Sequence, residues 1–175
     1  MSSEKAKVRA ERSEARETYE LLAIAAWVAV AILAINVSYF VGAEVGGQTF
    51  QSGLDFLPIL QAFTIGVLKA SPTILIAVAL VDFSFFFHRC GEGAVFTERN
   101  VATLKGGADS LIMAAVLSAL VKPFILGIIG DPDGGKILDF TDLALGVGLM
   151  GIALHGFGTV LKDAVALKDD NDQII

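Results

Sequence analysis

The sequence is poor in the residues that build disulfides, metal centres and secreted domains. It has one cysteine and two histidines in 175 residues, so no internal disulfide can form, and no Cys/His metal-ligand spacing occurs. It also lacks a block of positive charge, because residues 1–20 carry five cations and five glutamates. This balance argues against a polybasic lipid patch in the leader and against direct nucleic-acid binding. No small-residue cleavage pattern follows the first apolar run, so a secretory signal is not expected.

Charge is also nearly absent from four long stretches of the chain. The composition is 54% hydrophobic and 18% charged, outside the usual range of soluble domains. A helix needs about 20 mostly apolar residues to cross about 30 Å of hydrocarbon. The sequence therefore predicts an all-α polytopic membrane protein with four transmembrane helices in a bundle. The expected parts are a charged helical leader at 1–20, a membrane domain at 21–166 with spans at about 21–41, 72–89, 106–129 and 141–162, and an acidic tail at 167–175.

Lysine and arginine fall mostly on one side of these predicted spans. The leader, the connection 89–105 and the tail hold ten of them, whereas the connections 42–57 and 130–140 hold only Lys136. Because positive residues stay inside, both termini are expected to be cytoplasmic. Lys69 and Lys122 are interpreted as cations that reach to the outer boundary, and Asp139 or Asp142 could pair with Lys122.

The outer half of the second apolar region is harder to interpret. Glycines and polar residues at 42–57 predict a flexible outer loop. A single helix over 58–88 would be about 46 Å long, which exceeds the hydrocarbon thickness. Ser71-Pro72 is a typical helix start, so we expect an outer interfacial helix at about 55–69 and a second span from Pro72. One long helix kinked at Pro72 is the alternative.

Several local signals set helix ends and packing. Thr97 is expected to cap the third span, and Thr141 or Asp139 the fourth, while Pro123 could kink the third span near its outer end. The fourth span is rich in glycine, which lets helix backbones approach closely. The expected packing residues are Gly148, Gly151 and Gly158. These glycines are expected to pack against another helix of the bundle. The alternative is that they form a contact with another protein or with a second copy of the chain in a homo-oligomer.

Three ionisable residues fall inside the predicted spans at similar depth. They are Asp82, Asp109 and His155, each within about 6–11 Å of the inner boundary. Such residues are costly in lipid unless they are paired or hydrated. One interpretation is a proton-coupled or metal site in which His155 titrates. The other is a hydrogen-bonded polar cluster that fixes helix packing.

Two segments resemble a known family. Residues 91–101 read GEGAVFTERNV and are followed by Leu104-Lys105, and the tail at 167–175 reads LKDDNDQII. Both segments are similar to signatures of small bacterial four-span membrane proteins of the YoaS type, a domain of unknown function. The chain differs by carrying Arg99 where that family usually has an acid, and Gln173-Ile174 in place of Leu-Thr.

The resemblance implies a protein of the bacterial inner membrane, often encoded beside a small helix-turn-helix regulator, and it supplies no activity. The residues expected to contact a protein partner are Phe96, Thr97, Glu98, Asn100, Asp170, Asn171 and Asp172. We therefore expect a non-enzymatic membrane protein that binds or tethers a cytoplasmic partner and needs no cofactor or metal. Two alternatives stay open: an accessory structural subunit of a larger membrane complex, and a small proton-linked transporter or sensor.

Overall fold

The computed structural model describes residues 2–52, 55–129, 131 and 141–172, with the backbone alone for 2–12, 52, 142, 169 and 171–172. Its elements are all helical: α1 (Ser2–Ser52), α2 (Phe56–Gly91), α3 (Glu98–Val116), the π-helical turn η1 (Leu117–Val121), α4 (Lys122–Ile128) and α5 (Asp142–Asp172). Four stretches, in α1, in α2, across α3–η1–α4 and in α5, are long and apolar enough to cross a membrane. The prediction of an all-α protein with four spans is confirmed.

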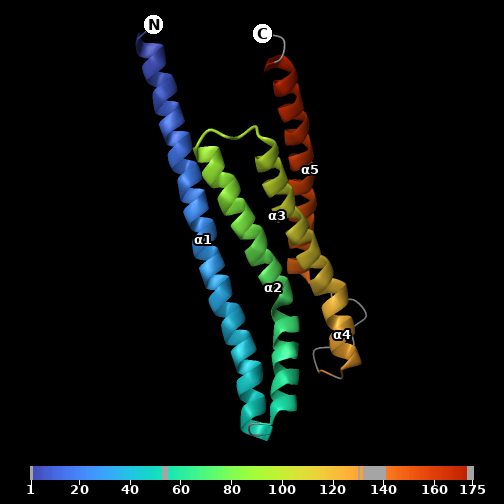
Figure 1. The fold of residues 1–175 in the computed structure, drawn as a ribbon. Coiled ribbons are helices and arrows are strands. Elements are labelled where there is room, and N and C mark those ends of the chain that lie inside the picture. Colours follow the sequence, from blue (N-terminus) through green and yellow to red (C-terminus); the bar gives the residue numbers. More distant parts are fainter. Residues whose placement is uncertain (1, 53–54, 130, 132–140, 173–175) are drawn as a thin grey trace.

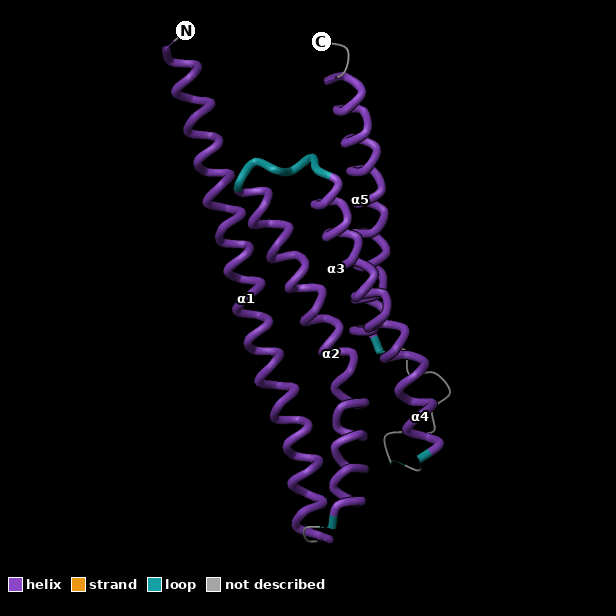
Figure 2. The backbone as a smooth tube through the Cα atoms, viewed as in Figure 1, coloured by secondary structure: helices purple, strands orange, loops and turns teal. Residues whose placement is uncertain are grey.

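The four long stretches stand side by side in a row (Figures 1 and 2). Extensive contacts join α1 to α2, α2 to α3 and α3 to α5. Within the described residues no contact of comparable extent joins α1 to α5, so the row stays open instead of closing into a ring. The start of α1 and the end of α5 lie at one end of the molecule, here called the terminal end. The turn from α1 into α2 lies at the opposite, hairpin end.

The expected flexible loop at 42–57 is wrong, because α1 continues as helix through Gly46 and Gly47 to Ser52. Its 51 residues give a length of about 77 Å. The neighbouring α2 supplies the packing that keeps this outer part helical. A Cβ added at Gly66 would lie only 3.1 Å from the Val41 Cα atom, so the two backbones approach closely there.

The break expected at Ser71-Pro72 is also wrong, and with it the separate outer helix at 55–69. Helix α2 passes through Pro72 without interruption, as the kinked-helix alternative proposed, and Figure 2 shows it changing direction partway along. Proline has no N–H to offer the carbonyl four residues earlier. That carbonyl belongs to Leu68, and the Ser71 hydroxyl donates to it at 2.6 Å. The neighbouring side chain thus replaces the lost bond inside the helix.

The remaining helix ends follow local chemistry. The Asn100 N–H donates to the Thr97 hydroxyl at the start of α3, and the Ala144 N–H donates to the Thr141 hydroxyl at the start of α5. Both predicted threonine caps are confirmed. The π-turn η1 ends at Val121, two residues before Pro123, which cannot donate to the preceding turn. Asp139, the other cap considered for α5, lies outside the described residues.

Helix α5 packs on α3 through the glycines singled out in the sequence. A Cβ at Gly148 would lie 3.0 Å from the Ala115 Cβ, and one at Gly158 would lie 2.8 Å from the Lys105 Cγ. At Gly151 the added atom would lie 2.9 Å from the Ala108 carbonyl oxygen. Backbone cannot move aside as a flexible side chain can, so Gly151 is the tightest point of the contact. These glycines set the distance between α3 and α5.

We predict that Gly151→Ala destabilises the α3–α5 pair, because the new methyl group would push on the α3 backbone. Overpacking of this kind costs about 1–3 kcal/mol. Gly156→Ala is the matched control, since nothing lies within 4 Å of a Cβ at Gly156. It should be neutral or slightly stabilising through helix propensity. Thermal unfolding of both variants in the same detergent checks this, and equal Tm values would contradict it.

Candidate functional site

The terminal end holds the main apolar cluster of the described residues. Its buried members come from α2, α3 and α5: Phe86, Cys90, Val101, Leu104, Leu161 and Val165. Tyr19 of α1 and Val95 of the α2–α3 connection pack against it. All four long helices therefore contribute to one core at this end. That core fixes the position of the connection between α2 and α3.

Asn100 belongs to this core and is fully buried, with 0% of its surface exposed. Its amide nitrogen donates to the Ala94 carbonyl at 2.9 Å and to the Cys90 sulfur at 3.3 Å. The side chain therefore ties the connection to the end of α2. The expectation that Asn100 forms part of a partner-binding surface is wrong, because nothing outside the protein can reach it.

The other candidates at 96–98 lie on or near the surface. Phe96 is 49% exposed and lies in the connection between α2 and α3. Thr97 serves as the helix cap, and Glu98 is exposed in the first turn of α3. Arg89 holds the same region by donating to the Thr103 hydroxyl at 2.8 Å. The connection thus presents an aromatic ring and a carboxylate from a fixed backbone.

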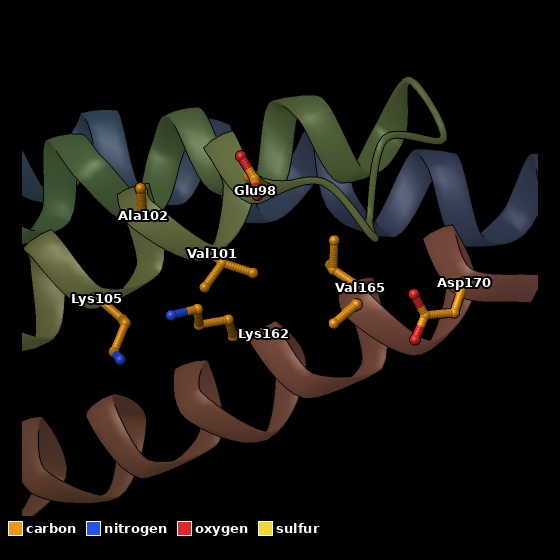
Figure 3. A pocket seen from close by; sticks show the side chains of 8 residues that line it. Glu98, Val101, Ala102, Lys105, Lys162, Val165 and Asp170 are labelled. Atoms are coloured by element: carbon orange, nitrogen blue, oxygen red, sulfur yellow. The ribbon is translucent and has the colours of Figure 1, made fainter. Parts of the chain in front are cut away.

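A groove of about 500 Å³ lies between α3 and α5 at the terminal end (Figure 3). Four charged and four small or apolar side chains line it: Glu98, Val101, Ala102, Lys105, Lys162, Val165, Ala166 and Asp170. Figure 3 shows the two lysines near one another and Asp170 further along α5. The groove therefore has a basic part toward the middle of the molecule and an acidic part toward the terminal end.

Among the described residues, the four charged side chains of the groove form no ion pairs with one another. Within the part of the chain that the structure describes, none of the ion pairs involves Glu98, Asp170 or either groove lysine. Of the predicted tail residues, Asp170 is exposed, while the side chains of Asn171 and Asp172 lie outside the described part. The groove thus offers charges to an outside ligand at both of its parts.

The structure brings together two of the three ionisable residues expected inside the spans. The His155 Nδ1 atom lies 2.7 Å from the Asp109 Oδ1 atom, which joins α5 to α3. Asp82 lies instead against Gly106, where an added Cβ would be 3.3 Å from its Oδ2 atom. None of the described contacts joins Asp82 to the pair. Across the described ranges, no group of three His, Cys, Asp or Glu side chains could hold a metal ion.

A second ionic site lies toward the hairpin end and was missed in the sequence. The Lys69 ammonium lies 2.9 Å from the Glu44 carboxylate and 3.2 Å from that of Asp131. The Lys69 side chain is only 10% exposed and is held in these two ion pairs, which the interpretation of Lys69 as a boundary cation did not include. These ion pairs join α1, α2 and the segment after α4. The available signal was the presence of single opposite charges at the outer ends of three apolar runs.

Lys122 is the other cation expected at that boundary. It lines a cavity of about 280 Å³ together with Lys69, Thr141 and residues of α2, α3 and α5. Its expected partners were Asp139 and Asp142. Asp139 lies outside the described residues, and so does the side chain of Asp142. Among the described residues Lys122 has no ion pair.

We predict that Lys69→Met destabilises the fold, because it leaves the carboxylates of Glu44 and Asp131 without their shared cation. Breaking a buried ion pair from one side costs about 3 kcal/mol. Lys122→Met removes the same charge without breaking a described pair and serves as the control. Thermal unfolding in detergent compares the two, and an equal loss of stability would contradict the role of Lys69.

We also predict that Asn100→Ala loosens the connection between α2 and α3. The Ala94 carbonyl would lose its 2.9 Å donor and keep only the Thr97 hydroxyl at 3.4 Å, and the loss of one such hydrogen bond costs about 1 kcal/mol. Arg99→Ala is the control, because the Arg99 side chain is exposed beside it. Limited proteolysis of the 91–97 segment measures the effect. Cleavage at the wild-type rate in Asn100→Ala would refute this role.

Comparison with known proteins adds a family and no activity. No curated protein and no solved structure matches the chain. One family, described as a protein of unknown function (DUF2975), matches residues 67–175. The matched part begins inside α2 and includes the groove, the Asp109–His155 pair and Lys69, whereas α1 lies outside it. Since the match covers well over half of its length, the chain belongs to the DUF2975 family of proteins of unknown function.

Proposed function

We propose that this protein is a non-enzymatic component of the bacterial inner membrane, with both termini in the cytoplasm, that tethers a soluble protein partner. The observation that carries the proposal is the acidic part of the groove, formed by Glu98 and Asp170, with the exposed Phe96 two residues before Glu98 in the chain. The excess of lysine and arginine on the terminal side supports the orientation.

The chemistry of this surface favours a basic amphipathic segment as the occupant. Two carboxylates without ion pairs attract lysine or arginine, and complementary charge fixes orientation and speeds association. Phe96 supplies an aromatic contact of the kind that dominates binding energies at protein interfaces. Val165 gives the same surface an apolar floor. A partner helix with basic and apolar residues on one face fits both features.

The resemblance to YoaS-type proteins supports a small helix-turn-helix regulator as this partner. Nucleic-acid-binding proteins carry a basic face that binds phosphates. A regulator that docks such a face on Glu98 and Asp170 would be held at the membrane and away from DNA. The tethering function would then require no catalysis and no cofactor.

We predict that Asp170→Lys and Phe96→Ala each reduce partner capture from native membranes by at least about 10-fold, the loss expected for one hot-spot contact. Asp163→Lys is the matched control, since Asp163 is exposed on the same helix but does not line the groove. Capture is measured by cross-linking in intact cells, followed by purification and quantification of each captured protein.

A soluble protein whose recovery falls in both variants and persists in Asp163→Lys would support the proposal. If every captured soluble protein is recovered equally from wild type, Asp170→Lys and Phe96→Ala, the acidic part of the groove does not bind a partner. Membrane expression of each variant is measured in parallel, so that loss of the protein is not mistaken for loss of binding.

An accessory role in a larger membrane complex is a second candidate, and the open row of helices favours it. Helices α1 and α5 form the two edges of the row, and each exposes large apolar side chains, such as Ile35 and Leu149. Another membrane protein could pack on either edge. Purification in mild detergent separates the two candidates: co-migration with membrane proteins in Asp170→Lys would favour the accessory role.

A further inference from the structure

The two lysines of the groove lie on adjacent helices, within about one helical turn of the same level. Lys105 directly precedes the predicted third span, and Lys162 ends the predicted fourth span. Since α3 and α5 are antiparallel neighbours, both residues lie where the predicted spans end on the terminal side. Lysine side chains at such positions extend toward the headgroups. We therefore expect the basic part of the groove to lie near the lipid phosphates of the leaflet at the terminal end.

The packing of α5 on α3 holds Lys105 in the groove. A Cβ at Gly158 would lie 2.8 Å from the Lys105 Cγ atom and 3.6 Å from its Cδ atom. The absence of a side chain at Gly158 thus leaves room for the stem of Lys105 across the α5 backbone. Lys162 follows Gly158 by one helical turn, on the same face of α5. Figure 3 shows both lysine side chains in the space between the helices.

In the described part of the chain, neither lysine has an ion pair. Glu98 precedes Lys105 by seven residues, about 10 Å along α3, and it lines the same groove as Lys162 without an ion pair to it. Asp170 follows Lys162 by eight residues, about 12 Å along α5. Asp109, on the deeper side, is bound to His155. Asp163 is adjacent in sequence but does not line the groove. Within the described residues, the two ammonium groups therefore face one space without an ion pair.

We propose that the basic part of this groove binds the phosphate of an anionic phospholipid from the leaflet at the terminal end. Basic pockets between transmembrane helices are known to take anionic headgroups. Val101, Ala102 and Val165 form apolar walls beside the lysines, against which the glycerol and the first acyl carbons of the lipid pack. The whole groove has a volume of about 500 Å³, which is sufficient for a headgroup with this attachment. The partner proposal does not use the two lysines, although both proposals use Val165.

The test uses the purified full chain in a neutral detergent. Phosphatidylglycerol, phosphatidylcholine with the same acyl chains, and glycerol 3-phosphate are titrated separately while the Tm is measured. Phosphatidylglycerol at 100 times its Kd should raise the Tm by at least about 5 °C. Phosphatidylcholine and glycerol 3-phosphate should leave it unchanged, because the first has no net charge and the second has no acyl chains.

The variant K105Q/K162Q should lose this Tm shift, and K168Q should keep it, since Lys168 is an exposed lysine of the same helix outside the groove. The exposed Lys162 also permits a milder variant: K162Q should weaken phosphatidylglycerol binding by about 10-fold and K162R should preserve it. This comparison decides the matter if the double variant does not fold.

Three results would overturn the inference. An equal shift with glycerol 3-phosphate would mean that the site takes a free phosphate compound instead of a lipid. An equal shift with phosphatidylcholine would mean that the acyl chains alone stabilise the protein. A shift of wild-type size in both K105Q/K162Q and K162Q would place the anionic lipid elsewhere. None of these results depends on partner capture, so they leave the tethering proposal to its own test.

Discussion

The contact between α3 and α5 is the constraint on which the rest of this structure depends. Glycines on α5 allow the two backbones to approach, and the tightest point is Gly151 against the Ala108 carbonyl. In lipid, close van der Waals packing replaces the hydrophobic driving force that joins helices in water. The same approach brings His155 to Asp109 and places the facing walls of the groove. The Asp109–His155 pair and the groove therefore both depend on the glycines of α5, which have no side chain to hold α3 away.

Much of this fold could be predicted because its signals are long or strictly local. An uncharged apolar run of about 20 residues has the length and composition of a membrane span. Thr97 and Thr141 cap their helices, as their positions in the sequence predicted. The failures came where a local signal competed with packing between helices. Pro72 is a good helix start in isolation, but the Ser71 hydroxyl satisfies the freed carbonyl and α1 supports the continuous helix. A single sequence does not encode which neighbour a helix will have.

The site was harder to predict for the same reason. Depth along a helix follows from residue number, so Asp109 and His155 were expected at one level. The direction in which a side chain points around the helix axis does not follow from residue number. Asp82 was therefore grouped with the other two residues, although it faces Gly106. Asn100 lies in a segment that resembled a surface motif, yet it is the buried residue that supports that segment. The pairing of Lys69 with Glu44 depends on the register of α1 against α2, which no local pattern reveals.

The position of Lys69 divides α2 into two parts of different length. Along α2, 20 residues separate Lys69 from Arg89, a rise of about 30 Å that equals the thickness of a hydrocarbon core. The part from Phe56 to Leu68 adds about 20 Å on the hairpin side of Lys69, and the end of α1, with Phe50 94% exposed, lies beside it. The pair of α1 and α2 is therefore longer than a hydrocarbon core is thick, and the ion pairs of Lys69 join it to the segment after α4.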